Sequence, residues 1–363
     1  MITSKIVFLI EEFNSSGGIK IVTAIANTLA ETGLKVGFIA PKYTQQPFYP
    51  LNKNIELTFL GSKKFGGKLF YFLHLFFRIM RFRGTLVTPN YRIAVIHKLT
   101  LSDKRSPFVF LIQGDDSVSL IKYSSSNKFV KCINSRILKL SKTTISERIF
   151  VSNYLMNNSN KKGTLIPNYI SEYFLNSQKR SLFKDEFVNI GTVSTLAPNK
   201  GFDFYLQCLD EIIGKSEGKT KFRFICATQH PLLSHSKTSH KIDFVSPKNE
   251  QEMSNFYQNC DFYISCSISE GFNLPVLEAM ASGCIVIATN DGGVTDFIAN
   301  GKNGYLIETR DARSVSDILN QLIQNKELLF EMQGMAIQKA KQYSREKFNH
   351  AYLNFFDKLI RIN

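Results

Sequence analysis

The most informative segment of the chain reads Ser269-Glu270-Gly271-Phe272-Asn273-Leu274-Pro275-Val276-Leu277-Glu278-Ala279-Met280-Ala281-Ser282-Gly283-Cys284-Ile285-Val286-Ile287-Ala288-Thr289. The run from Asp261 to Cys266 before it predicts a strand, Gly271 predicts a turn, and Pro275 fits the first turn of a helix. Gly283 then predicts the end of that helix, directly before a second apolar strand from Cys284 to Ala288. Strand, loop, helix and strand in this order are typical of a parallel α/β sheet.

The same alternation extends outward along the chain in both directions. Short β-rich runs separated by helical patterns predict further strands at Lys5–Ile10, Lys35–Ala40, Ile55–Leu60, Thr85–Thr88, Phe108–Ile112, Thr143–Ser146, Phe187–Val193, Lys221–Ala227, Ile242–Val245 and Gly304–Ile307. Helical patterns close the chain at Asp311–Gln324, Lys326–Gln342 and Ser344–Leu359. Because the strand and helix pattern restarts near Phe187, we expect two doubly wound α/β domains of the Rossmann type.

The length of 363 residues supports this division, since it exceeds what one hydrophobic core usually serves. We place the N-terminal domain at 1–170 and the C-terminal domain at 186–343, and we interpret the polar, aperiodic segment Asn168–Asp185 as the linker. Residues 344–363 form a C-terminal helix that is a candidate to pack back on the N-terminal domain.

Composition and charge narrow the class of protein. The six cysteines form no C-x-x-C pair, which argues against a zinc site or a disulfide framework and favours a reducing cytoplasm. No apolar run reaches the roughly 18 residues of a membrane-spanning helix, and the apolar start of the chain is too short for a signal peptide. The net charge of +15 lies in the first half, where residues 1–175 hold 24 Lys and Arg against 9 Asp and Glu. Such asymmetry predicts that this half meets an anionic surface.

Two carboxylates and a set of backbone amides mark the loop and helix at 269–289 as a ligand site. In doubly wound sheets, ligands bind beyond the carboxyl ends of the strands, where Glu270 and Gly271 are expected. The amides of Phe272, Asn273 and Leu274 fall at a helix N-terminus, which is a usual place to hold a diphosphate. Glu270, and Glu278 one turn into the helix, are placed to accept hydrogen bonds from sugar hydroxyls.

Glu270 and Glu278 with seven residues between them, followed by Ala279-Met280-Ala281-Ser282-Gly283, resemble the signature of retaining glycosyltransferase family 4, among the glycosyl transferases of group 1. The resemblance implies the GT-B fold, in which two Rossmann-like domains face a central cleft. It implies that Glu270 contacts the donor sugar and acts in catalysis, that Glu278 contacts the ribose of the nucleotide, and that Gly271 to Leu274 contact the sugar and the diphosphate.

A second part of the family pattern is the turn from Gly191 to Asp203, at the end of the first strand of the second domain. Lys200 matches the lysine that grips the diphosphate in the family, so it is assigned to donor binding and catalysis. The family places an arginine five positions earlier, where this chain has Thr195. Loss of one cation should weaken stabilisation of the leaving diphosphate, because charge-assisted contacts to phosphate are about twice as strong as neutral ones.

Two features of the first half extend the site. Gly17 and Gly18 follow the first strand and resemble the family's glycine-rich loop that reaches donor phosphates. They do not form the G-x-G-x-x-G fingerprint of a nicotinamide dehydrogenase. Gln113 follows a strand where many relatives carry a histidine, and it is a candidate polar contact on the acceptor side.

The resemblance implies a hexosyltransferase, or one for a related sugar, that uses a UDP-, GDP- or dTDP-sugar and builds cell-surface polysaccharide or lipopolysaccharide. The expected scheme needs no cofactor and no metal, because the leaving diphosphate itself takes the proton of the acceptor hydroxyl while Lys200 and helix N-termini stabilise its charge. The acceptor is expected to be a glycan or a lipid-linked molecule.

Two basic amphipathic segments in the first half of the chain suggest where the protein is located. On a helical wheel, Lys128, Lys131, Lys139 and Lys142 share one arc, and His74, Arg78 and Arg81 share another beside many apolar residues. Such helices suit the anionic inner face of the cytoplasmic membrane, so the protein is expected in the cytoplasm with peripheral membrane binding as the hypothesis. Ordinary layer helices with solvated cationic faces explain the same pattern.

One rival enzyme and one non-catalytic binding protein remain as alternative hypotheses. A nucleotide-sugar epimerase shares the two-domain architecture, and a non-catalytic sugar-nucleotide binder would explain the missing arginine at Thr195. Nucleic acid is not an expected partner, because no aromatic-interleaved basic motif or helix-turn-helix pattern is present. The sequence leaves undetermined the donor, the acceptor, the linkage and the oligomeric state.

Overall fold

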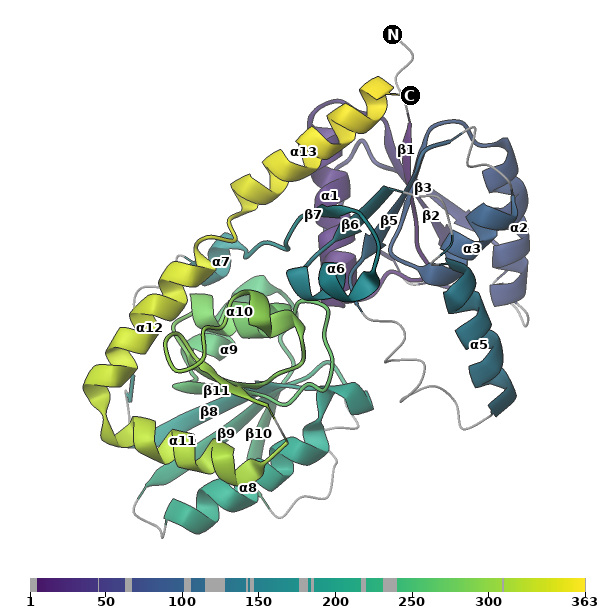
Figure 1. The fold of residues 1–363 in the computed structure, drawn as a ribbon. Coiled ribbons are helices and arrows are strands. Elements are labelled where there is room, and N and C mark those ends of the chain that lie inside the picture. Colours follow the sequence, from purple (N-terminus) through teal and green to yellow (C-terminus); the bar gives the residue numbers. More distant parts are fainter. Residues whose placement is uncertain are drawn as a thin grey trace. The chain divides into compact units, whose positions relative to one another are not determined.

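The computed structural model describes residues 5–44, 46–62, 67–100, 106–114, 128–141, 143, 147–175, 182–183, 186–216, 220–230, 240–308 and 310–362. The chain divides into two compact units, of which unit 1 comprises Met1–Pro167 with Glu346–Asn363 and unit 2 comprises Asn168–Arg345 (Figure 1). Each unit contains one parallel sheet with helices on its faces, which confirms the predicted pair of doubly wound Rossmann-like domains.

Unit 1 has a seven-stranded sheet in the order β3-β2-β1-β4-β5-β6-β7. The strands are β1 (Ile6–Leu9), β2 (Val36–Pro41), β3 (Glu56–Leu60), β4 (Thr85–Thr88), β5 (Phe108–Ile112), β6 (Glu147–Phe150) and β7 (Thr164–Leu165). The helices are α1 (Gly17–Glu31), α2 (Gly67–Arg81), α3 (Tyr91–Leu99), α5 (Lys128–Ser141), α6 (Asn153–Ser159) and α13 (Arg345–Ile362), of which α13 reaches into unit 1 from Glu346 onward. The strands β1, β2 and β4 are buried along their whole length, as expected for a sheet covered on both faces.

The core of unit 1 lies between the sheet and the helices α2, α3 and α5. Tyr71, Leu75 and Ile79 of α2 pack there with strand residues such as Val7, and the Tyr71 hydroxyl donates a hydrogen bond of 2.7 Å to the Ile10 carbonyl. Helix α3 contacts both α2 and α5, so the three helices form one layer. Helix α13 belongs to unit 1 as well, since the Thr28 hydroxyl of α1 donates a hydrogen bond of 2.8 Å to Asn349 Oδ1.

Unit 2 has a six-stranded sheet in the order β10-β9-β8-β11-β12-β13. The strands are β8 (Phe187–Val193), β9 (Lys221–Ala227), β10 (Ile242–Val245), β11 (Phe262–Ser265), β12 (Ile285–Thr289) and β13 (Tyr305–Ile307). The helices are α7 (Glu172–Leu175), α8 (Phe202–Ser216), α9 (Glu250–Gln258), α10 (Leu274–Ala281), α11 (Ala312–Gln324) and α12 (Lys326–Ala340), with short 3-10 turns η2 (Pro198–Lys200) and η4 (Gly293–Asp296).

Both sheets place the first strand of the unit beside the fourth, so the strand order reverses between β1 and β4 and again between β8 and β11. Ligands bind at such switch points, beyond the carboxyl ends of the strands. In unit 2 this is the region of the β8 to η2 turn and of the loop after β11.

Two predictions about elements were wrong. The strand expected at Thr143–Ser146 is instead β6 at Glu147–Phe150, because Ile149 and Phe150 are the buried residues and Thr143 is exposed; residues 144–146 lie outside the described residues. The short strand β7 was missed.

The linker predicted at Asn168–Asp185 is also partly structured. Its start joins unit 2, where Phe174 of α7 is buried, the Ser254 hydroxyl of α9 donates to the Tyr173 carbonyl at 2.8 Å, and the Ser171 hydroxyl donates to Glu250 at 3.0 Å. Residues 176–181 and 184–185 of the predicted linker lie outside the described residues.

Five of the six cysteines, Cys208, Cys226, Cys260, Cys266 and Cys284, are buried free thiols in unit 2, whereas Cys132 on α5 is exposed. Burial raises the pKa of the Cys226 thiol to about 12. Among the described helices, none is both long and apolar enough to cross a membrane.

Candidate functional site

The loop from Cys266 to Asn273 joins β11 to α10 at the carboxyl edge of the unit 2 sheet. Its middle is held by the neighbouring loop after β12, since the Glu270 amide donates a hydrogen bond of 3.1 Å to the Asp291 carbonyl and Glu270 forms a parallel bridge with Gly292. The two loops therefore run side by side, and Glu270 sits at the strand end where the sequence predicted it.

Lys200 reaches the same place from the turn after β8. The Ile268 amide donates a hydrogen bond of 2.8 Å to the Asn199 carbonyl, which ties η2 to the loop of Glu270. Gly201 has a φ of 64° and lies against the first residue of the loop after β11, where a Cβ would stand 2.0 Å from the Cys266 carbonyl oxygen, so only glycine permits this approach. Lys200 Nζ consequently lies 2.8 Å from Glu270 Oε1, with side chains that are 22% and 19% exposed.

Helix α10 begins without a side-chain cap. Asn273 occupies the cap position, but its φ of 63° is left-handed and its side chain turns inward, where Nδ2 donates to Asp291 Oδ2 and to Ser265 Oγ. Pro275 stands in the first turn and has no N–H to satisfy. The start of α10, next to Lys200 and Glu270, therefore keeps the positive end of the helix dipole and its amides for an anion.

Asp291 is almost fully buried and accepts a hydrogen bond from the Asn273 side chain of this loop. Its Oδ1 accepts a hydrogen bond of 3.2 Å from the Val294 amide. Burial, and next the nearby charge of Glu270, raise the pKa of the Asp291 carboxyl from 3.8 to about 7, against the hydrogen bond from Asn273 and the charge of Lys200. The loop thus places the carboxyl groups of Asp291 and Glu270 close to the ammonium of Lys200.

Glu278 lies on α10, buried, one turn beyond the start of the helix. Its Oε2 accepts a hydrogen bond of 3.2 Å from the Tyr257 hydroxyl of α9. Tyr257 is fully buried, and its pKa is raised well above the usual value by burial and then by the charge of Glu278. The pair fixes the orientation of the Glu278 carboxylate.

The residues between the two glutamates are held by packing. A Cβ on Gly293 would lie 2.6 Å from the Phe272 amide nitrogen, so the Gly292–Gly293 turn rests directly on the Gly271–Phe272 backbone. The Phe272 ring is buried and lies 5.5 Å from the ring of Phe297. Leu274 is buried as well. The segment from Gly271 to Leu274 is therefore held in place by its packing contacts.

Thr195 is partly buried in the turn after β8, and its Oγ1 accepts a hydrogen bond of 3.1 Å from the Ala197 amide. The hydroxyl stabilises the turn but supplies no positive charge. Lys200 is thus the cation that the structure brings to Glu270 from this turn.

In unit 1 the structure brings together the predicted residues Gly18 and Gln113. Gln113 Nε2 donates a hydrogen bond of 3.2 Å to the Gly18 carbonyl, and a Cβ on Gly18 would lie 2.7 Å from Gln113 Oε1. Gly17 and Gly18 begin α1, whose cap is Ser16, with a hydroxyl that accepts from the Ile19 amide. Gln113 thereby fixes the start of α1, at the carboxyl edge of the unit 1 sheet.

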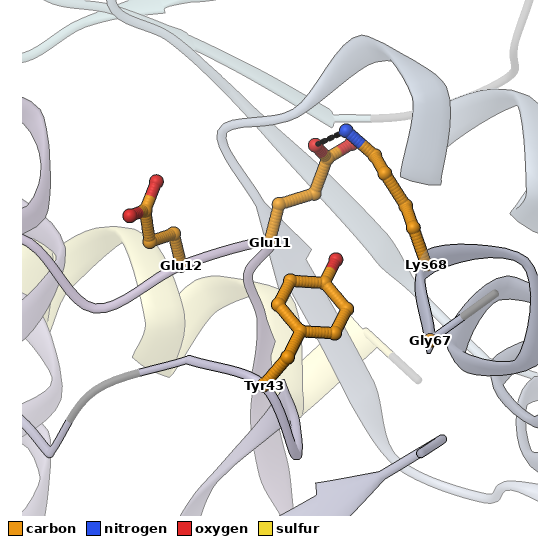
Figure 2. A pocket seen from close by; sticks show the side chains of 5 residues that line it. All are labelled: Glu11, Glu12, Tyr43, Gly67 and Lys68. Carbon is orange, nitrogen blue, oxygen red and sulfur yellow. Dashed lines mark ion pairs between the residues drawn. The ribbon is translucent and has the colours of Figure 1, made fainter. Parts of the chain in front are cut away.

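A polar cavity of about 250 Å³ opens at the same edge of unit 1, lined by Glu11, Glu12, Tyr43, Gly67 and Lys68 (Figure 2). Lys68 Nζ lies 3.3 Å from Glu11 Oε2, and Arg92 approaches the same oxygen at 3.5 Å. Burial, and then the charges of Glu11 and Glu12, raise the pKa of the Tyr43 hydroxyl. None of these residues was predicted from the sequence to take part in binding or catalysis.

The loop from Asp291 to Asp296 resembles the Gly-Gly loop of the family in sequence, but the buried carboxyl of Asp291, the contact of Tyr257 and the inward side chain of Asn273 were not predicted. Asp291 carries a local signal, because it follows a strand and precedes Gly292 and Gly293 in the pattern of a ligand loop. Tyr257 gave no signal, since its contact with Glu278 joins two helices that are separated along the chain.

Residues 175–343 match the family model described as glycosyl transferases group 1. An uncharacterized glycosyltransferase of Haemophilus influenzae is 25% identical over 362 residues, which are 94% of this chain and 97% of that protein. An uncharacterized glycosyltransferase of Methanocaldococcus jannaschii is 26% identical over 251 residues, covering 66% of this chain and only 65% of its relative.

Solved structures share the fold over nearly the whole chain. HepE of Anabaena in complex with UDP-glucose has a TM-score of 0.73 at 16% identity and covers 98% of this chain and 100% of its own. WaaG, a glycosyltransferase involved in lipopolysaccharide biosynthesis, has a TM-score of 0.72 at 15% identity, and the match covers 95% of this chain and 98% of WaaG. Both likenesses bear on the fold, which is GT-B, whereas the match to the family model covers residues 175–343, all of which lie in unit 2. Unit 2 is thus the part of the chain that matches the glycosyl transferases group 1 family.

Proposed function

We propose that this chain is a retaining glycosyltransferase that moves a hexosyl or related sugar from a nucleotide-sugar donor to a glycan or a lipid-linked acceptor. One observation carries the proposal, namely the pair of Lys200 Nζ and Glu270 Oε1 at 2.8 Å beside the uncapped start of α10. A sugar diphosphate requires both a cation with free N–H donors for its phosphates and a carboxylate for its hydroxyls. The site combines these within one rigid set of loops.

Each site residue of unit 2 then has a defined role in donor binding. Lys200 and the backbone from Gly271 to Leu274 hold the diphosphate and the sugar, Glu270 accepts from a sugar hydroxyl, and Glu278 accepts from the ribose. The ion pair with Glu270 orients Lys200 before the donor arrives, so Lys200 exchanges part of this contact for the phosphates. Thr195 contacts the donor without charge.

In unit 1, Gly17 and Gly18 allow close approach of a phosphate to the start of α1, and Gln113 is an acceptor-side contact. The reaction we infer breaks the bond between the anomeric carbon and the diphosphate and forms the new glycosidic bond on the same face. The leaving diphosphate takes the proton of the acceptor hydroxyl, and Lys200 stabilises the charge that develops. Because HepE binds UDP-glucose, UDP-sugars are the first donors to test.

The test begins with melting temperatures of the full chain in a panel of UDP-, GDP- and dTDP-sugars, since a ligand that binds the native state raises the melting temperature. With the donor so found, we expect Lys200→Met to lower turnover about 100- to 1000-fold, the usual cost of removing one group that stabilises a developing anion. Lys215→Met is the matched control, because Lys215 pairs with Asp317 on the surface of the same unit. A Lys200→Met enzyme as active as the wild type would contradict the assignment.

Two alternatives give different outcomes in the same assays. An epimerase of this fold releases a free sugar isomer or an isomerised donor without any acceptor. A non-catalytic binder, which the uncharged Thr195 favours, shows the thermal shift but no turnover with any acceptor. The anomeric coupling constant of the product, measured by proton NMR, separates retention from inversion.

We also infer a cytoplasmic location with peripheral binding to the inner face of the cytoplasmic membrane, and a place in the synthesis of cell-surface polysaccharide or lipopolysaccharide. The basic first half of the chain supports the membrane part, and the likeness to WaaG suggests the lipopolysaccharide part. Of the two basic segments considered from the sequence, Lys142 lies outside the described residues, as do the side chains of Lys128 and Lys131. Helix α2 is described in full.

A further inference from the structure

Helix α2 buries only a narrow face. Its 15 residues run from Gly67 to Arg81, and its buried side chains are Tyr71, Leu75 and Ile79, spaced by four residues. These three pack into the core of unit 1, and the helix covers one face of the sheet beside α3 (Figure 1). Such a helix in a soluble protein normally has a polar outer face.

The outer face of α2 is apolar instead. Five large side chains are between 42% and 73% exposed, namely Leu69, Phe70, Leu73, Phe77 and Met80. At 100° per residue they fall within an arc of about 100°, centred nearly opposite the buried face. They form a continuous stripe along the helix, and exposed apolar stripes of this kind mark a contact with a membrane or another protein.

Basic side chains border this stripe on one side. His74, Arg78 and Arg81 are exposed, occupy the next 60° or so of the wheel, and are followed by exposed Arg83 just after the helix. The helix contains no Asp or Glu. Lys68 is excluded from this group, because its ammonium turns to Glu11 in the cavity at the start of the helix (Figure 2).

We propose that α2 lies in the surface of an anionic phospholipid bilayer, with the five apolar side chains among the acyl chains and Arg78 and Arg81 at the lipid phosphates. The proposal refines the membrane contact of the proposed function, and rests on it for its biological purpose. Charge complementarity selects this occupant, since a helix with an apolar stripe, two arginines on its border and no acidic residue matches an anionic interface. The polar cavity at the start of α2 would then lie close to lipid headgroups.

Vesicle binding by the full chain tests the proposal without any donor. We expect binding to vesicles of phosphatidylglycerol and phosphatidylcholine in equal parts, weak binding to pure phosphatidylcholine, and partial release in high salt. The triple variant Leu69→Ser, Leu73→Ser, Phe77→Ser should bind at least about tenfold more weakly, because it removes most of the inserted apolar area. The double variant Ile213→Ser, Phe330→Ser is the control, since these exposed apolar residues lie in unit 2.

The absence of tryptophan from the chain allows a direct measurement of insertion. Phe77→Trp places the single indole on the stripe, and its fluorescence should shift to the blue with anionic vesicles and be quenched by brominated acyl chains. Phe330→Trp, on α12, should show neither change. Equal behaviour of the two tryptophans would overturn the proposal.

Other outcomes separate this proposal from its rivals. If the wild type forms a dimer that the serine triple variant loses, while neither binds vesicles, the stripe is an interface with a second copy and the proposal fails. Thermal shifts by the nucleotide sugar should be the same for the wild type and the triple variant. If the wild type itself does not bind any nucleotide sugar, the proposed function fails, whereas the result on vesicle binding still stands.

Discussion

Asp291 illustrates how one buried side chain sets a pH dependence of stability. Because the folded protein raises the pKa of this carboxyl from 3.8 to about 7, the native state holds a proton that the unfolded chain loses above 3.8. The contribution of Asp291 to the free energy of unfolding is therefore complete below pH 4 and decreases as the pH rises through 7. The total change is on the order of a few kcal/mol.

The variant Asp291→Asn removes this titration. Relative to the wild type, its free energy of unfolding should increase between pH 4 and 7 and stay level above, whatever constant cost arises from the changed contact with Asn273. Denaturant titrations of both proteins across this range measure the difference. A flat difference for Asp291→Asn would show that the pKa of Asp291 is not raised.

Thr195 is the residue at which the site departs from the pattern it resembles. We expect Thr195→Arg to raise the affinity for a nucleotide diphosphate about tenfold, because one added charge-assisted hydrogen bond contributes roughly 1.5 kcal/mol or more. Isothermal titration with UDP, GDP and dTDP measures this change. The variant Thr195→Val, which loses the hydroxyl that accepts from Ala197 but gains no charge, is the control. Unchanged affinity of the arginine variant would place position 195 away from the phosphates.

The charged residues of the candidate site could be predicted from the sequence, whereas the buried residues that hold them in position could not. Lys200 and Glu270 stood out because each follows a predicted strand, and the structure brings them to 2.8 Å. The left-handed Asn273, whose side chain turns to Asp291 instead of capping α10, could not be predicted, since a favoured capping residue just before a helix normally caps it.

At the scale of elements, the turn η2 depends on Gly201. Replacing it by alanine forces a Cβ to 2.0 Å from the Cys266 carbonyl and a φ of 64° on a residue that avoids it. We expect Gly201→Ala to lower the free energy of unfolding by about 2 kcal/mol or more. Donor binding should weaken as well, because Lys200 must move.

Gly214, near the end of the following helix α8, provides the matched control. A Cβ at Gly214 meets no atom within 4 Å, so Gly214→Ala should stabilise the protein by about 0.5 to 1 kcal/mol through the helix propensity of alanine. Urea titrations of the two variants should thus shift in opposite directions. A stable Gly201→Ala protein would mean that η2 is not packed against the loop after β11 as described.

Elements with strong periodicity were predicted well. Eleven of the strands coincide with predicted runs to within one residue at each end, because their apolar stretches are bounded by turn residues. The shift of the predicted Thr143–Ser146 strand to β6 has a physical cause. β-branched threonines favour a strand locally, but burial of Ile149 and Phe150 against the sheet decides its position.

At the scale of the whole molecule, unit 1 is completed by the C-terminal end of the chain. Phe348, Tyr352 and Phe356 of α13 are buried at spacings of four residues. We expect Phe356→Ala to destabilise unit 1 by about 3 to 5 kcal/mol, the usual cost of truncating a buried phenylalanine. Amide hydrogen exchange should increase in peptides from β1 and α1.

Peptides from β12 and α10 should keep their protection in the Phe356→Ala variant, since they lie in unit 2. The exposed Phe330 on α12 supplies the control, and Phe330→Ala should leave both sets unchanged. Increased exchange that is equal in both units would contradict an assignment of α13 from Glu346 onward to unit 1.

The unequal burial of the thiols has a practical consequence for spectroscopy. Only a thiolate reacts quickly with maleimides, and the five cysteines of unit 2 are closed to solvent, with Cys226 protonated far above neutral pH. A fluorophore or spin label added to the native wild-type chain should therefore attach once, at Cys132 on α5. The unmodified protein thus already carries a single-site reporter on unit 1, within the helical layer that contains α2, α3 and α5.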